Sequence, residues 1–546
     1  MKLKNLIVGY AALGAVCSSC YQNEKADLIV HNAKIVTVNA QNEIFEAMAI
    51  KDGKIIALGA EREILNRYSA EKMHDAKKMT VYPGFIDAHS HFLGYATNKG
   101  ELSLHGVKSE AELVERVEKF AATSQREWVV GRGWDHTTWA SQTYPTNRLL
   151  DSLYPKRPVI LQRIDGHALL ANSEALRRAG IDANTKIDGG VVMKNSQGAL
   201  TGVLLDAAAD KAEAAVIPLG NNLLAELIGR AERECFEAGL TMVTDMGLSL
   251  RKIDFLDSLQ AAGNLKMPVY ALLQPEEGVL ERMKSGTVVK DKFMVRGVKI
   301  YADGALGSRG ALMKRPYSDD EGNYGLRVLN DSIFNIYSQA CLKYGFQLCV
   351  HAIGDSANAE ILRLMGDALG EMNDYRWRIE HAQVVSPEDR HYFTDYGIIP
   401  SMQPVHATSD MAWVQDRLGP EREPHAYAIK SLKETIGMLP FGTDFPVESI
   451  SPIANYYAAV FRKNIHGEPA EGYRMNEALT REEALKGLTI WAAMACFEDN
   501  RRGSLEIGKR ADFIILDRNL LKCSESEILR AKVKATYLDG IMVFAP

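Results

Sequence analysis

The chain has 546 residues, of which 46% are hydrophobic and 25% are charged, and its formal net charge at pH 7 is −6. These values are typical of a soluble globular protein, and the length predicts at least two structural units. The mild acidity, together with a sequence that has no basic block, argues against a nucleic-acid partner.

The first twenty residues resemble an export signal. A basic start is followed by an apolar run from Leu6 to Val16 and by small residues up to Cys20. The run is too short to span a bilayer permanently, and a buried N-terminal helix is the alternative. A cysteine directly after two serines resembles the lipidation site of bacterial lipoproteins, with Cys17 as a rival position. We therefore expect an exported protein of the cell envelope (periplasm or outer membrane) that contacts membrane only through a lipid on Cys20.

The two ends of the mature chain share a β-type pattern. Residues 21–80 and 501–546 contain short runs of alternating hydrophobicity, with Asp52-Gly53 and Asp539-Gly540 at hairpin turns. Neither end is large enough to form a stable sheet alone. The pattern predicts one composite β-sandwich formed by the N- and C-terminal segments, with residues 81–500 inserted between them.

The long middle contains eight short apolar runs, most of them followed by a polar loop and a helical pattern. The runs are Met79–Ile86, Leu240–Asp245, Val269–Leu273, Val295–Asp303, Phe346–His351, Trp377–His381, Ile398–Gln403 and Leu439–Asp444. This repetition predicts an α/β fold, a (β/α)8 TIM barrel. Catalytic residues of such barrels lie at the C-terminal ends of the strands, where several of these runs end in His, Asp or Gln.

About 150 residues separate the first run from the second, which is too many for a loop. We predict that residues 95–235 form a large insertion after barrel strand 1, on the catalytic face, where it can cover a substrate. Within it, Trp134 of "GWD" and His167 of "DGH" are candidate substrate contacts. Structural roles are the alternative for both residues.

Four histidines stand at the ends of predicted strands. His89 and His91 of "PGFIDAHSH" are two positions apart, so both imidazoles can point to one side of a strand. An HxH pair alone is weak evidence of a metal site. His351 and His381 end two further strands at equivalent positions, and this convergence favours a metal.

Two more residues extend this group. Asp444 follows the eighth run, where its alternative role is to cap the next helix. Lys299 lies in an apolar strand, and burial shifts a lysine toward the neutral amine. A neutral amine can add carbon dioxide to form a carbamate, whose two anionic oxygens can bridge two cations. A salt bridge to Asp303 is the alternative for Lys299.

These six residues lie within long motifs. The motifs are "PGFIDAHSH", "GWD", "DGHALLANSEAL", "VKIYADGALGSRGA", "HAIGD", "IEHAQ", "MQPVHATSD", "FGTDFPVE" and "GSLEIGKRADFIILD". Their sequence and order resemble the metal-dependent amidohydrolase superfamily, and more narrowly the amidohydrolase-3 (YtcJ-like) family. The resemblance implies that His89, His91 and Asp444 hold one metal, that His351 and His381 hold a second, and that a carboxylated Lys299 bridges both.

This ligand set suits zinc, with one or two ions bound and with iron, manganese or nickel as other occupants. We expect hydrolysis of a non-peptide carbon–nitrogen bond in a small amide or cyclic amide, by a metal-activated water with Asp444 as general base. Arg309 and His406 lie in family motifs and are further candidate substrate contacts. The alternatives are an esterase, lactonase or deaminase reaction at the same site, or a metal-loaded binding or regulatory protein. A homodimer is left open.

Overall fold

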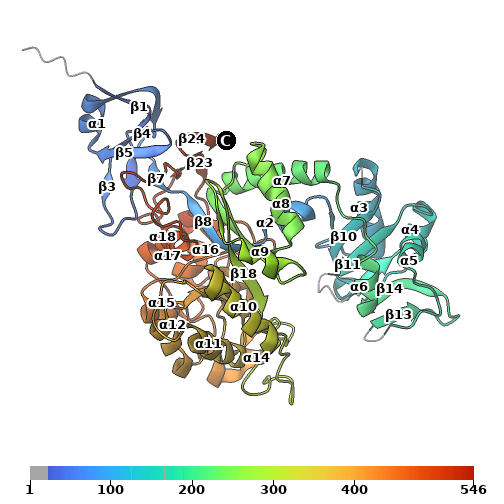
Figure 1. The fold of residues 1–546 in the computed structure, drawn as a ribbon. Helices are drawn as coiled ribbons and strands as arrows, with labels where there is room; N and C mark the ends of the chain where they lie inside the picture. The colour runs from blue at the N-terminus through green and yellow to red at the C-terminus, as the bar shows by residue number, and fades with distance from the viewer. Residues whose placement is uncertain (1–22, 125, 164–167, 188–189) are drawn as a thin grey trace, which may run out of the picture.

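The computed structural model describes residues 23–124, 126–163, 168–187 and 190–546. The expected signal with Cys17 and Cys20 lies outside these ranges, and its processing stays a prediction. The expected α/β architecture is confirmed, with a barrel, a two-sheet sandwich and a separate insertion (Figure 1). No helix within the described ranges is both long and apolar enough to cross a membrane.

The sandwich is assembled from both ends of the chain, as predicted. Its first sheet has the order β5 (Lys54–Gly59), β4 (Ala47–Lys51), β1 (Glu24–His31), β6 (Tyr68–Asp75). The second sheet has the order β24 (Ile541–Phe544), β23 (Val533–Leu538), β22 (Phe513–Leu516), β7 (Thr80–Pro83), β2 (Lys34–Val36), β3 (Ile44–Phe45). Antiparallel pairing of β7 with β22 joins the two ends, and Val30, Ile35, Phe513 and Ile515 fill one core between the sheets.

Seven parallel strands form most of the barrel wall. They are β8 (Phe85–Ser90), β15 (Leu240–Leu248), β16 (Val269–Leu273), β18 (Phe293–Tyr301), β19 (Gln347–Ala352), β20 (Arg378–His381) and β21 (Ile399–Ser401). Residues 439–444, the eighth predicted strand, close the gap between β21 and β8 through isolated hydrogen bonds. Gly442 N–H donates to Met402 O (3.1 Å), and Ala88 N–H donates to Phe441 O (3.0 Å).

Helices cover the outside of this barrel (Figure 1). They include α7 (Asn221–Glu237), α8 (Leu250–Ala261), α9 (Val279–Lys284), α10 (Asp331–Tyr344), α11 (Asp355–Leu369), α12 (His391–Tyr396), α15 (Ile429–Ile436) and α16 (Pro452–Phe461). Their buried apolar faces and the outward side chains of the strands share one large core. The α-helical layer therefore holds the strand ends, and with them the site, in fixed positions.

The first predicted barrel strand, Met79–Ile86, is divided in the structure. Its first half is β7 of the sandwich, and the barrel strand β8 begins only after Gly84. A Cβ at Gly84 would lie 2.2 Å from side-chain atoms of Thr241 in β15, so only glycine fits where the chain passes from one domain to the other. One apolar run covers both strands because both are buried, and periodicity alone does not reveal the break.

The insertion is shorter than the predicted 95–235, since its end belongs to the barrel. Helix α7 buries Ile228, Ala231 and Phe236 in the barrel core and packs against α2 (Phe92–Asn98). The hydrophobic pattern of α7 is the same whether it faces an insertion or a barrel strand, so the sequence did not separate the two.

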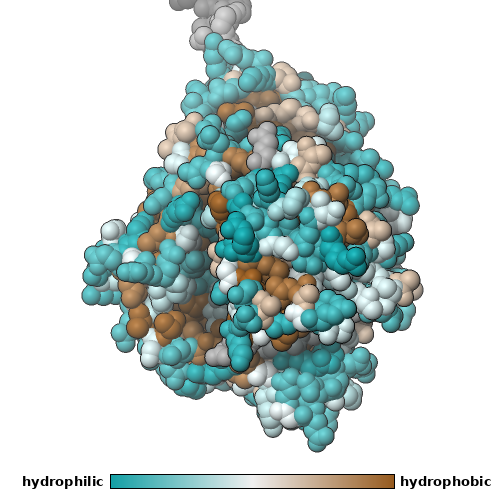
Figure 2. All heavy atoms as spheres, turned by 90° about the vertical axis from the view of Figure 1, so that its right-hand side faces the viewer, coloured by the Kyte–Doolittle hydropathy of each residue, from teal (hydrophilic) through white to brown (hydrophobic). Residues whose placement is uncertain are grey.

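The insertion itself is a small α/β unit built on a six-stranded sheet. The strands are β13 (Gly190–Lys194), β14 (Leu200–Asp206), β12 (Ala168–Ala171), β11 (Val159–Arg163), β10 (Val129–Trp134) and β9 (Leu102–Ser103), in that order. Helix α3 (Glu110–Thr123) packs on one face, and α5 (Ser173–Arg178) and α6 (Ala207–Glu213) pack on the other. Hydrophilic side chains cover most of the outer side of the molecule that the insertion presents (Figure 2).

Gly84→Ala is expected to destabilise the protein, because the added Cβ overlaps buried Thr241 atoms at 2.2 Å. Overpacking of this kind costs about 1–3 kcal/mol in the free energy of unfolding. Gly229→Ala in α7 is the matched control, since its Cβ meets only a distant Arg233 guanidinium at 3.9 Å. Alanine should stabilise that helix by about 0.5–1 kcal/mol. Denaturant unfolding of both variants tests this, and a Gly84→Ala midpoint equal to wild type would contradict it.

Candidate active site

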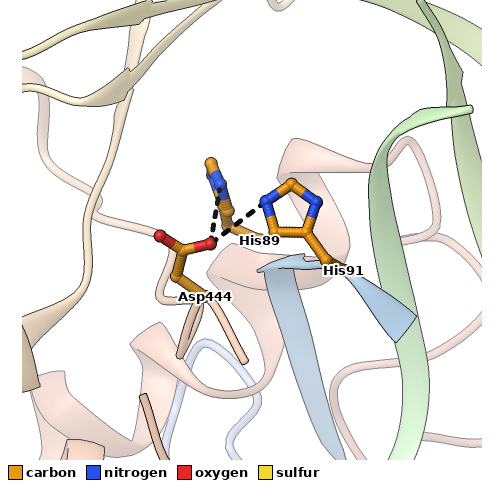
Figure 3. Close-up of side chains that lie close together, drawn as sticks. All are labelled: His89, His91 and Asp444. Carbon is orange, nitrogen blue, oxygen red and sulfur yellow. Dashed lines mark ion pairs between the residues drawn. The ribbon is translucent and has the colours of Figure 1, made fainter. Parts of the chain in front are cut away.

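Three side chains meet at the mouth of the barrel. His89 comes from the end of β8, His91 lies at the start of α2, and Asp444 ends the closing segment (Figure 3). Asp444 Oδ1 lies 3.5 Å from His89 Nε2 and 3.3 Å from His91 Nε2. The sequence prediction that these residues come together is thus met by the geometry. Their ligand atoms lie within 4.8 Å of one another, close enough to share one metal ion.

Asp444 is held in place by the backbone of β8. Its N–H donates to His89 O (2.8 Å), and Asp87 accepts from the Thr443 N–H (3.1 Å) and hydroxyl (2.7 Å). A Cβ at Gly442 would lie 2.4 Å from the His89 Cβ, so glycine permits this close approach. Asp444 has φ +61°, a strained backbone conformation that costs about 1–3 kcal/mol and is common at active sites.

His351 and His381 complete the ring of histidines. They lie on the neighbouring strands β19 and β20, with ring centroids 4.6 Å apart, and His381 is also 4.6 Å from His89. His381 Nδ1 donates to Gln403 Oε1 (2.9 Å), which leaves Nε2 free to bind a metal. A second group of ligand atoms within 4.8 Å comprises His381, His406 and Asp444. His351 is adjacent to this group but is not part of it.

His406 lies at the same centre, but its contacts arrange it as a hydrogen-bond donor rather than as a metal ligand. It projects from α13 (Pro404–Asp410), and its Nε2 is 3.8 Å from Asp444 Oδ2. The Gln383 side-chain amide lies 3.2 Å from His406 Nδ1, which must accept this hydrogen bond. The ring proton is then on Nε2, which points toward the cavity. His406 can therefore donate a hydrogen bond into the cavity, and its expected contact with substrate stays a prediction.

Lys299 is buried in β18 below the histidines, with 1% of its surface exposed. Burial lowers the pKa of its ammonium group. The alternative of a salt bridge to Asp303 is not what the structure shows. Asp303 accepts backbone hydrogen bonds from Leu312 (2.9 Å), Ile353 (3.0 Å) and Gly354 (2.8 Å), and burial raises its pKa to about 7.

A buried carboxylate that the sequence reasoning missed orients His89. Glu380 Oε2 accepts from His89 Nδ1 at 2.6 Å, and its Oε1 lies 2.7 Å from Arg378 Nε. All three side chains are fully buried in the barrel interior. A carboxylate partner fixes the tautomer of a metal-binding histidine and makes its other nitrogen more basic. The sequence indicates this buried carboxylate in "RIEH", where the charged residues Arg378 and Glu380 interrupt an apolar strand.

The charge states match what a metal requires. Burial and nearby Lys299 lower the pKa of His89 to about 4 and that of His351 to about 3, so both rings are neutral at pH 7. Burial alone would raise the pKa of Asp444. The nearby histidines His89, His91 and His406 lower this pKa by a larger amount, so the net shift is downward. The centre therefore offers His89 and His351 as neutral imidazoles and Asp444 as an ionised carboxylate, the forms that bind divalent metals.

The hydrogen bonding of two polar atoms at this centre is also consistent with a bound metal. Within the described part of the chain, His89 Nε2 and Asp444 Oδ1 are buried without a hydrogen-bond partner. Buried polar atoms of this kind are costly unless a ligand or ion satisfies them. The donor set of imidazole nitrogens and carboxylate oxygen is the one that zinc and related transition metals prefer.

A cavity of about 400 Å³ opens above this centre. Its lining includes His91, Lys299, His351, His381, His406 and Asp444, whereas His89 is fully buried and does not line it. Trp134 does not line it. Its indole is fully buried in the core of the insertion and donates to Leu161 O at 2.7 Å, which corrects its expected role as a substrate contact. Arg309 is paired with Asp319 outside the lining, and His167 lies outside the described residues.

The barrel, the composite sandwich and this centre define the class of metal-dependent hydrolases. The family model for the amidohydrolase family matches residues 72–544, and the chain belongs to that family. The Bacillus subtilis protein YtcJ, named as an amidohydrolase, is 30% identical over 94% of this chain and 99% of its own length.

Two further relatives share nearly the whole chain. An N-substituted formamide deformylase of Arthrobacter pascens is 28% identical over 94% of this chain and 98% of its own length. The crystal structure of an uncharacterised metal-dependent hydrolase from Pyrococcus furiosus is similar with a TM-score of 0.78 and 29% identity, covering 91% of this chain and all of that one. The protein is thus an enzyme, a hydrolase of the amidohydrolase family.

Glu380→Gln is expected to weaken metal binding by about 10–100-fold, because glutamine does not hold His89 as an ionised partner does. The change also leaves Arg378 without its buried counter-charge, so unfolding should become easier. Metal content by mass spectrometry and competition with a chelator measure the first effect. Glu388→Gln, at an exposed carboxylate paired with Lys314, is the control. Wild-type metal affinity in Glu380→Gln would show that His89 is positioned by other contacts.

Proposed function

We propose that this protein hydrolyses the carbon–nitrogen bond of a small non-peptide amide, with zinc as its metal. The observation that carries the proposal is the Asp444 carboxylate, which lies within 3.5 Å of two metal-type imidazoles and also lines the cavity. A carboxylate in this position can act on water beside a bound metal. A protein that only bound metal would have no need for it to face a substrate.

His89, His91 and Asp444 would hold one zinc ion, and His351, His381 and a carboxylated Lys299 would complete a second position. A bound zinc ion supplies Lewis acidity, which polarises a carbonyl group and lowers the pKa of water. The fit rests on the buried atoms His89 Nε2 and Asp444 Oδ1.

Two residues of the chain then have separate roles, since one transfers the proton and the other stabilises the negative charge on the carbonyl oxygen. Asp444 is ionised, so it can accept a proton from the attacking water and pass it to the leaving nitrogen. His406 carries its proton on Nε2, so it can donate a hydrogen bond to the carbonyl oxygen as negative charge develops there. Both side chains are more than nine-tenths buried, so little of either is open to solvent.

The similarity to the formamide deformylase favours an open-chain amide with a substituent on nitrogen. Formyl and acetyl amides of primary amines are therefore the first substrates to test. The cavity of about 400 Å³ is large enough for an amide with one ring or a short chain.

Asp444→Asn is expected to lower kcat by at least about 10²-fold, because an amide of similar shape cannot accept the proton. Metal content should fall only modestly, since the histidine ligands remain. The measurement is kcat on the best formyl or acetyl amide, alongside metal by mass spectrometry. Asp416→Asn, at an exposed position on α14 (Val414–Arg422), controls for loss of a carboxylate. Near-normal kcat with full metal in Asp444→Asn would place the base elsewhere, and metal-replete wild type that turns over no amide would contradict the proposed reaction.

Lys299→Ala is expected to lose bound metal and activity, because it removes the amine that would form the carbamate. Formate or acetate should partly restore both by supplying carboxylate oxygens in the space of the missing side chain. A carbamate carbon should appear in NMR spectra of wild-type protein loaded with metal in ¹³C-bicarbonate, and not in spectra of the variant. An unmodified Lys299 in a crystal structure of metal-replete protein would rule out carboxylation.

A further inference from the structure

Two carboxylates stand in the outer wall of the active-site cavity, away from the proposed metal ligands. Asp410 lies one helical turn after His406 on α13, so both side chains face the same side. Glu448 follows Asp444 on the next segment, and it accepts from the Ser409 hydroxyl at 2.6 Å. This bond ties Glu448 to the residue before Asp410, and both carboxylates line the cavity.

Two arginines beside this wall are paired with a carboxylate outside it, and one of them, Arg417, also has its guanidinium carbon 5.6 Å from the centre of the Trp413 ring. Arg309 donates to Asp319 from both Nε (3.0 Å) and Nη2 (2.9 Å), and Arg417 donates to the same carboxylate. Among the described residues that line the cavity, Lys299 is the one lysine or arginine, and it lies at the buried floor. The outer part of the described lining therefore carries two carboxylates and no lysine or arginine, and the guanidinium that contacts Trp413 is paired with Asp319.

An aromatic ring completes the wall. Trp413 lines the cavity, and its ring packs so closely on Gly307 that a Cβ there would lie 3.2 Å from the indole. Leu306 and Ile353 line the same space and make it partly apolar. Tryptophan is the best aromatic partner for a cation, and a desolvated contact of this kind strengthens binding.

A chain of hydrogen bonds connects this wall to the reaction centre. The Tyr427 hydroxyl donates to Asp410 Oδ2 and lies 3.4 Å from Gln383 Oε1, while the Gln383 amide donates to His406 Nδ1. His406 Nε2 is buried, faces the cavity and has no hydrogen-bond partner within the described part of the chain. His406 and Asp410 line the same cavity, so one ligand can contact both.

We propose that the outer half of the cavity is a subsite for an ammonium group, formed by Asp410, Glu448 and Trp413. The inference rests on the proposed amide hydrolysis and specifies its substrate class. The preferred substrates are amides whose organic substituent carries a protonated or quaternary amine beside an apolar group. Amides that carry a free carboxylate, such as N-acyl amino acids, are disfavoured because two like charges would meet them.

Benzyltrimethylammonium is a direct probe of this subsite, because a quaternary ammonium cannot coordinate a metal. Benzylsulfonate is the anionic counterpart of similar shape. We expect metal-loaded protein to bind the cation at least tenfold more tightly than the anion in calorimetry at pH 7.5 and low salt. The affinity for the cation should fall as salt is added, since screening weakens charge attraction.

Asp410→Asn and Glu448→Gln keep the shape of each side chain and should each weaken binding of the cation about three- to tenfold. Trp413→Leu should weaken it as well, through loss of the aromatic face. Glu281→Gln, which removes an exposed carboxylate on the outer helix α9, is the charge-matched control and should leave binding unchanged. Circular dichroism and thermal melting of each variant establish that it is folded.

Equal or tighter binding of benzylsulfonate, binding of neither probe, or unchanged binding in both Asp410→Asn and Glu448→Gln would overturn the subsite. Turnover of amides provides the separate test. Cation binding without hydrolysis of any amide would keep the subsite and contradict the proposed reaction. Hydrolysis without preference for a cationic over a carboxylate-bearing amide would keep the reaction and overturn the subsite.

Discussion

Closure of the barrel is the constraint on which the site depends. Residues 439–444 do not form a regular strand, yet their hydrogen bonds to Met402 and to β8 complete the wall. Asp87 binds Thr443, and His89 O binds the Asp444 N–H, so the first and last barrel segments are joined where the chemistry lies. The two ends of the candidate metal centre, separated by more than 350 residues in sequence, are therefore held by the same contacts that close the fold.

The second constraint on the site is the group of charged side chains buried in the barrel interior. Arg378, Glu380 and His89 occupy the barrel interior together, where an unpaired charge would be strongly unfavourable. Their mutual pairing offsets desolvation and fixes the His89 ring. The same burial keeps the His89 and His351 imidazoles neutral, while the net shift of the Asp444 pKa is downward and leaves that carboxylate ionised. One low-dielectric interior thus prepares both kinds of ligand at neutral pH.

Chemistry and recognition are divided between the floor and the wall of the cavity. The floor carries His351 and His381 on strand ends and Asp444 on the segment that closes the barrel, whose positions the barrel fixes. The wall carries Asp410 and Trp413 on segments that follow the strands, where side chains can change without disturbing the core. The insertion has hydrophobic cores of its own on both faces of its sheet, so its stability does not depend on the cavity.

The sequence by itself determined the barrel, the composite sandwich and the polar residues at the strand ends, because periodicity and strand-end position are local properties. The resemblance to a known family also assigned His89, His91 and Asp444 to one centre. Only the tertiary structure decided which buried groups support them. Glu380 reaches His89 from a strand 291 residues away, and Trp134 turns into a core rather than toward substrate. Packing between distant segments sets these contacts. A local sequence pattern does not show which residue a buried aromatic ring or carboxylate will contact.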